Sequence, residues 1–228
     1  GTTLVEQIIS SHTLVSGAGE MDFASNLGEE LANGSTPADT SSLQGFRKNY
    51  LAKIRKVSKG SPNVTDKMPL NFRLLGLIAT ALPEAKIVHV KRDRAAVCWS
   101  NYVQYFISKN LNYSYSLYDI AKYYSLYESI MEYWHRTLGN KIYNLDYDSL
   151  VENQEYESRQ VINYLNLDWE NGILSPHRNS RAVKTASNVQ IRRRIYQGSS
   201  KKWTNYESFI NKDSENLVIS ELFKSPKD

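Results

Sequence analysis

The chain has 228 residues, of which 41% are hydrophobic and 23% charged, and its formal net charge is +4. This balance is typical of a globular domain, and the mild positive charge suits an anionic ligand but falls short of a nucleic-acid-binding surface. The longest apolar run, residues 74–82, is about half of the roughly 18 residues that a membrane span needs. Cys98 is the single cysteine, and the four histidines show no metal-site spacing, which excludes an internal disulfide and disfavours a metal cluster.

Apolar periodicity predicts helices separated by short strands. In chain order, we expect helices at 3–11, 27–31, 46–58, 71–82, 95–107, 115–138, 150–165 and 214–223, and strands at 63–66, 86–90 and 141–145, with residues 13–40 mostly in loops. The run KIVHV at 86–90 is typical of a fully buried strand. Strands that alternate with helices favour an α/β fold with a parallel sheet flanked by helices, within a single domain over residues 1–228.

The opening residues Gly1, Thr2 and Thr3 run directly into the first predicted helix. They fit the second half of a phosphate-binding loop, because backbone N–H groups at a helix N-terminus attract anions, but taken alone they favour a plain helix N-cap. The Walker pattern GxxxxGK[ST] is absent from the chain. A second anion site is expected where Arg92 ends the strand at 86–90, because its guanidinium and the hydroxyl of Ser100 on the next helix can converge on one phosphate.

Five segments, in the same order, resemble the sulfotransferase family, in the branch of tyrosylprotein sulfotransferases and of bacterial sulfotransferases attached to tetratricopeptide repeats. They are GTTLVEQIISSH with GAGE at 1–20, DKMPLNF at 66–72, KIVHVKRDRAAVCWS at 86–100, YNLDYDSLVENQ at 143–154 and TASNVQIRRRIYQGSSKKW at 185–203. In this family a strand and Pro-Arg-Ser precede the Gly-Thr-Thr. The chain begins with glycine rather than methionine, so we expect an N-terminally truncated fragment whose first strand and start of the phosphate loop are missing.

The resemblance implies a P-loop NTPase-like fold and a defined reaction. The enzyme would move a sulfuryl group from 3′-phosphoadenosine 5′-phosphosulfate (PAPS) to an acceptor hydroxyl without a metal, leaving adenosine 3′,5′-bisphosphate (PAP). Glu20 is then the expected general base, Lys67 the cation beside the transferred group, and Ser187 a hydroxyl donor to it. His12 is the rival base, since other sulfotransferase branches use histidine.

The resemblance also assigns residues to the donor nucleotide. Arg92 and Ser100 would hold its 3′-phosphate. The other expected contacts come from the phosphate loop, one residue near the adenosine and the C-terminal loop: Gly1, Thr2, Thr3, Tyr147, Asn188, Gln190 and Lys202. His89, inside the predicted strand, is expected to be a hydrogen-bonded core residue rather than a ligand.

Three departures from the family pattern qualify this assignment. Arg94 stands where proline is usual, and Gln104 stands where tyrosylprotein sulfotransferases carry an additional phosphate-binding arginine. The single cysteine cannot form the disulfides of the Golgi enzymes, which favours a cytoplasmic enzyme of bacterial type over one of the Golgi lumen.

The acceptor stays open at the sequence level: a peptide tyrosine, a sugar or a small alcohol each offers a hydroxyl. We expect segments 21–45 and 107–117 to form the acceptor groove. Tetratricopeptide repeats upstream are possible.

Two alternatives remain, a P-loop kinase or NTPase and a non-catalytic interaction module acting through its tyrosine-rich helix. The first would need Mg²⁺ and a Walker lysine, and the second would have no need of Glu20, Lys67 and Arg92 together.

Overall fold

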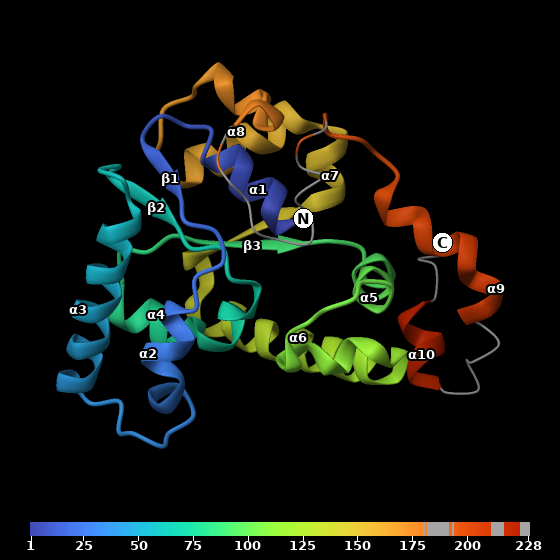
Figure 1. Ribbon diagram of the computed structural model, residues 1–228, viewed down its shortest axis with the longest axis horizontal. Helices are drawn as coiled ribbons and strands as arrows, with labels where there is room; N and C mark the ends of the chain where they lie inside the picture. Colours follow the sequence, from blue (N-terminus) through green and yellow to red (C-terminus); the bar gives the residue numbers. More distant parts are fainter. Residues whose placement is uncertain (180, 182–191, 193, 211–216, 224–228) are drawn as a thin grey trace.

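The computed structural model describes residues 1–179, 181, 192, 194–210 and 217–223 (Figure 1). The strands are β1 (Val15–Gly17), β2 (Asn63–Thr65), β3 (Ile87–Lys91) and β4 (Ile142–Asp146). The α-helices are α1 (Thr2–Ile9), α2 (Phe23–Ala32), α3 (Thr40–Val57), α4 (Leu75–Ala81), α5 (Arg94–Tyr102), α6 (Leu117–Leu138), α7 (Tyr147–Glu152), α8 (Gln154–Tyr164), α9 (Glu207–Ile210) and α10 (Leu217–Leu222). Among these residues no helix is long and apolar enough to cross a bilayer.

Short polar side chains fix where several helices begin. Asp39 accepts a hydrogen bond from the Ser42 backbone N–H at 2.8 Å at the start of α3. Asp93 does the same for Ala96 at 2.7 Å at the start of α5, and Ser116 caps α6. Each cap satisfies a backbone donor that has no partner inside the helix. These residues therefore fix where the helices around the strands begin.

All the strand pairings in the described part of the chain are parallel. β1 pairs with β2 from Val15 opposite Asn63, and β3 pairs with β4 from Ile87 opposite Ile142. Helices α1, α7 and α8 lie on one side of β3, and α4 and α6 lie on the other (Figure 1). The fold is therefore α/β with parallel strands flanked by helices, as the sequence predicts, but its strands form two separate two-stranded sheets rather than one.

A cavity of about 1790 Å³ lies between the secondary-structure elements. It is lined by residues of α1, β1, β2, β3 and α6, including Val5, Val15, Val64, Val88 and Tyr127. For this reason β3 is half-buried along most of its length, and the prediction of a fully buried strand is wrong.

Other predicted boundaries also differ from the structure. The segment 13–40, expected to be mostly loop, contains β1 and the whole of α2. The helix expected over 95–107 ends at Tyr102, and the one expected over 150–165 is divided at Asn153 into α7 and α8. Asn153 has φ −129° and ψ 58°, outside the helical region, which interrupts the helical hydrogen bonds there.

Candidate functional site

The structure brings the predicted base and the predicted cation together. Glu20 follows β1 and Lys67 follows β2, and parallel neighbours present these ends at the same edge. The Lys67 Nζ donates to Glu20 Oε1 at 2.5 Å, with the two side chains 9% and 37% exposed. The Lys67 backbone N–H donates to the Gly19 carbonyl at 2.9 Å, which ties the two loops together. Both side chains line the cavity.

Asp66, which directly precedes Lys67 in the chain, has partners of its own. Its Oδ2 accepts hydrogen bonds from Tyr50 Oη at 2.8 Å and from Asn71 Nδ2 at 3.3 Å. Burial raises the pKa of Asp66 to about 6, against the hydrogen bonds from Tyr50 and Asn71, which lower it. Asp66 therefore anchors the backbone beside Lys67, and the Lys67 ammonium pairs with Glu20 instead.

Arg92 lies directly after β3 and faces the C-terminal part of the chain. Its Nε donates to Ser200 Oγ at 2.8 Å and its Nη2 to Ser199 Oγ at 3.2 Å. Its guanidinium carbon lies 4.8 Å from the centre of the Tyr147 ring, and the Tyr147 hydroxyl lies 3.3 Å from Ser199 Oγ. Asp93, the partner expected for a surface arginine, caps α5 instead. These contacts hold a half-buried guanidinium in one orientation.

The start of α1 lies beside this arginine cluster. A Cβ added to Gly1 would come within 2.4 Å of the Tyr147 ring, so Gly1 is close against that ring. Thr2 and Arg92 line the same cavity, and Thr3 is buried in the first turn. Gly1, Arg92 and Tyr147, all predicted to contact the donor, are thus neighbours in the fold although they lie far apart in the sequence.

Ser100 and Lys202, two further predicted donor residues, have surroundings of their own. Ser100 lies on α5 as an exposed residue. Lys202 lies in a 3₁₀ helix over Ser199–Tyr206, with its Nζ 5.5 Å from the centre of the Tyr196 ring. Ser187, Asn188 and Gln190 lie outside the described residues.

His12 is buried and fully hydrogen-bonded, which argues against its role as the rival base. It lies beyond the end of α1, with 2% of its surface exposed. The Leu14 backbone N–H donates to Nδ1 at 3.0 Å, so Nδ1 is an acceptor and Nε2 donates to the Asp168 carbonyl at 2.9 Å. Both ring nitrogens of this tautomer hold structural hydrogen bonds.

An aromatic wall, formed by Phe72, Tyr113, Tyr123 and Tyr127, borders the cavity. Tyr113 and Tyr123 stack with their ring centres 4.1 Å apart, and Phe72 meets Tyr127 edge-on at 5.2 Å. His89 Nδ1 donates to Asn144 Oδ1 at 2.9 Å, and Nε2 of the neutral ring accepts from Tyr127 Oη at 2.5 Å, so both nitrogens are hydrogen-bonded. Burial lowers the pKa of His89, which favours its neutral form.

Two pairs of residues near the site were not predicted from the sequence. Ser199 and Ser200 bind the Arg92 guanidinium, and nothing in a polar C-terminal segment distinguishes them beforehand. Glu6 and Arg181 form a buried ion pair with a 2.7 Å Nη2–Oε2 distance. The signal for Glu6 was a charged residue inside the stretch Leu4–Ile9, whose other residues apart from Gln7 are apolar. A charge that is buried with such a helix needs a partner. Among the described residues no group of three metal-binding side chains is close enough to hold an ion.

Comparison with known proteins places this arrangement in a family. A model of the sulfotransferase family matches residues 1–171, and the chain belongs to that family. The chain is 34% identical over 244 residues to an uncharacterized protein of Aquifex aeolicus (strain VF5), and it spans 32% of that curated relative's length. In fold it is similar to a sulfotransferase domain from the curacin biosynthetic pathway, with a TM-score of 0.62 at 14% identity over 99% of this chain and 94% of that one.

Proposed function

We propose that the protein transfers a sulfuryl group from PAPS to an acceptor hydroxyl. The observation that carries the proposal is the Glu20–Lys67 pair at 2.5 Å, held at the edge of a large cavity that Arg92 also lines. A carboxylate beside an ammonium supplies a proton acceptor and a fixed positive charge at one place, which sulfuryl transfer between oxygens needs. Family membership supports the same reaction class.

The residues present fit an anionic nucleotide. The Arg92 guanidinium donates to the Ser199 and Ser200 hydroxyl oxygens, which occupy the acceptor positions that phosphate oxygens take in charge-assisted pairs. The backbone N–H groups of the first turn of α1 lie at the same cavity, at the positive end of the helix dipole. Tyr147 offers an aromatic face beside Arg92. This set favours a phosphorylated adenosine as donor.

The chain's own residues then divide the chemistry. The bound donor supplies an electrophilic sulfuryl group and a nucleotide leaving group. Glu20 accepts the proton of the acceptor hydroxyl through its second oxygen as the new O–S bond forms and the bridging S–O bond breaks. Lys67 stays protonated and counters the negative charge that develops on the leaving oxygen. Positioning and electrostatics supply most of the rate, as in phosphoryl transfer.

The acceptor belongs to the proposal only as a hydroxyl-bearing molecule. The segments expected to shape its groove contribute Asn26, Glu29, Leu111 and Tyr113 to the cavity lining, and 23–32 does so as a helix rather than as a loop. A cytoplasmic location and upstream tetratricopeptide repeats stay predictions from the sequence.

Titration calorimetry and a transfer assay test the proposal together. We expect the purified protein to bind PAP without magnesium and to bind ATP–Mg²⁺ more weakly. Radiolabelled PAPS offered with phenols, peptides containing tyrosine, sugars and small alcohols should label at least one class. Preference for ATP–Mg²⁺ would replace this function by a kinase or NTPase, and binding of neither nucleotide would favour an interaction module.

The Glu20→Gln variant tests the general base independently of donor binding. The variant should lose transfer by about 100-fold or more, the usual scale for a general base, while the Kd for PAP is unchanged. The matched control is Glu155→Gln, which neutralises the exposed partner of Arg159 on α8 and should leave both quantities unchanged. Transfer by Glu20→Gln at the wild-type rate would show that Glu20 is not the base.

A further inference from the structure

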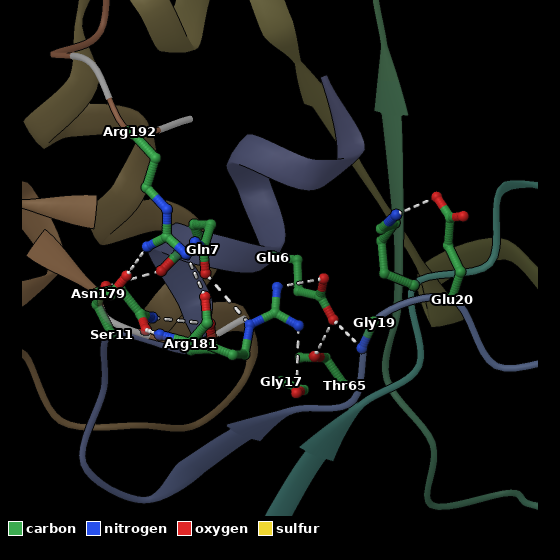
Figure 2. Close-up of polar contacts among 12 residues, drawn as sticks. Glu6, Gln7, Ser11, Gly17, Gly19, Glu20, Thr65, Asn179, Arg181 and Arg192 are labelled. Carbon is green, nitrogen blue, oxygen red and sulfur yellow. Dashed lines mark hydrogen bonds and ion pairs between the residues drawn. The ribbon is translucent and has the colours of Figure 1, made fainter. Parts of the chain in front are cut away.

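The carboxylate of Glu6 is buried at the centre of a polar network behind the catalytic loops. Its side chain is 2% exposed and projects from α1. Oε2 accepts a hydrogen bond from Arg181 Nη2 at 2.7 Å, while Oε1 accepts from the Gly19 backbone N–H at 2.8 Å and from Thr65 Oγ1 at 2.9 Å. Figure 2 shows Glu6 between Arg181 on one side and Gly19 and Thr65 on the other. Both oxygens of a buried charge are therefore satisfied.

One oxygen of Glu6 joins the two loops that carry the Glu20–Lys67 pair. Gly19 directly precedes Glu20, and Thr65 lies two residues before Lys67. Two backbone bonds also join these loops, from Ala18 N–H to the Thr65 carbonyl at 3.0 Å and from Lys67 N–H to the Gly19 carbonyl at 2.9 Å. The carboxylate thus adds charge-assisted bonds to both loops at the point where their spacing is set.

Arg181 holds this carboxylate in place from a distant part of the chain. Its side chain is 13% exposed, and it also donates to the Gly17 carbonyl at 3.2 Å and to Gln7 Oε1 at 3.3 Å. The backbone carbonyl of Arg181 accepts a hydrogen bond from Arg192 Nη2 at 2.6 Å. A Cβ on Gly17 would lie 2.8 Å from Arg181 Nε, so glycine there makes room for the guanidinium. The ion pair therefore packs against β1, shortly before the chain reaches Glu20.

We propose that Glu6 and Arg181 are positioning residues that fix the spacing of Glu20 and Lys67 for sulfuryl transfer. This inference rests on the proposed function, because it assigns the pair a role in that reaction. A buried ion pair adds little net stability compared with apolar residues of similar volume, since desolvation offsets its attraction. Its contribution here is orientation: it adds charge-assisted bonds to two catalytic loops that are otherwise joined by backbone bonds and by the Glu20–Lys67 pair itself.

Glu6→Gln tests the role because it keeps the shape and an oxygen acceptor but removes the charge facing Arg181. We expect kcat to fall by about 10- to 100-fold, the scale on which a displacement of ~1 Å acts on catalytic groups, with KM for the donor unchanged. The control for lost stability is Val161→Ala, which opens a cavity in the hydrophobic cluster that α1 packs into. At a temperature where both variants are folded, an equal kcat in the two would mean that Glu6 is merely structural and would overturn the inference.

Combining variants shows whether the pair acts as one unit. Arg181→Met should lower kcat about as much as Glu6→Gln, and the double variant should lose no more than either single one, because the second substitution removes a partner that has already lost its contact. Losses that multiply would show that the two residues act independently and would refute a shared role.

Acylation of Lys67 gives a readout that does not depend on activity. With an amine-reactive ester and mass spectrometry, Lys67 should be modified several-fold faster in Glu6→Gln than in the wild type, while the exposed Lys48 on α3 reacts equally in both. If the wild type transfers sulfuryl groups but Glu6→Gln matches it in kcat and in Lys67 acylation, the inference fails and the proposed function stands. If the wild type transfers nothing but acylation is faster in Glu6→Gln, the function fails and Glu6 still positions Lys67.

Discussion

Asp66 makes the folded protein less stable as the pH rises through the acidic range. Burial raises its pKa to about 6 from the ordinary value of 3.8. Between these values the folded state keeps a proton that the unfolded state releases, so the free energy of unfolding falls with rising pH, and the loss is complete above the folded pKa. A shift of roughly two units at about 1.4 kcal/mol per unit amounts to about 3 kcal/mol.

Asp66→Asn removes this ionisation but keeps an oxygen that accepts from Tyr50. Urea unfolding of both proteins from about pH 4 to about pH 8 measures the difference in free energy of unfolding, in which the other titrating groups cancel. We expect this difference to change by about 2.5 kcal/mol in favour of the variant over the range, because part of the loss already occurs below pH ~4. Asp39→Asn is a control of opposite sign, because the hydrogen bond from the Ser42 backbone lowers the pKa of Asp39. A difference between Asp66→Asn and the wild type that is constant to within about 0.5 kcal/mol would refute the reasoning.

Two further variants test the donor site and the packing. Arg92→Ala should raise the Kd for PAP by about 10- to 150-fold, equivalent to the roughly 1.5–3 kcal/mol of a hydrogen bond to a charged group, and calorimetry showing an unchanged Kd would contradict its phosphate role. Gly76→Ala should destabilise the protein by about 1–2 kcal/mol in urea unfolding. A Cβ at Gly76 would lie 2.7 Å from the Trp134 ring, which is held by a hydrogen bond, and this crowding outweighs the ~1 kcal/mol gained in helix propensity. Gly45→Ala, with open space around it in α3, should be stabilising, and equal effects of the two substitutions would exclude crowding as the cause.

The periodicity of apolar residues predicted the long helices, because each of these helices buries its apolar residues along one face. The helix expected over 115–138 is α6 at Leu117–Leu138, and its start is fixed by Ser116, a local cap that a sequence displays. The three-residue strand β1 was missed, because Val15–Gly17 is too short to show any period and, unlike the equally short β2, contains glycine, which is depleted in strands. It becomes a strand through its pairing with β2, which lies about 50 residues further along the chain.

The candidate site, too, could be predicted from the sequence only in part. Motif order was enough to select Glu20, Lys67 and Arg92, and the family it indicated is confirmed by the match over residues 1–171. Their roles stay predictions, but the 2.5 Å contact between Glu20 and Lys67 arises only when two parallel strands end at one edge.

Local sequence therefore determined the family, the class of fold and most helices of this protein, because propensity, caps and short motifs act over a few residues. Tertiary structure alone decided that His12 is a buried structural residue, that β3 faces a cavity, and that Glu6 meets Arg181. The physical reason is that a buried polar group takes its role from its partner, and the partner of Glu6 is 175 residues away in the chain.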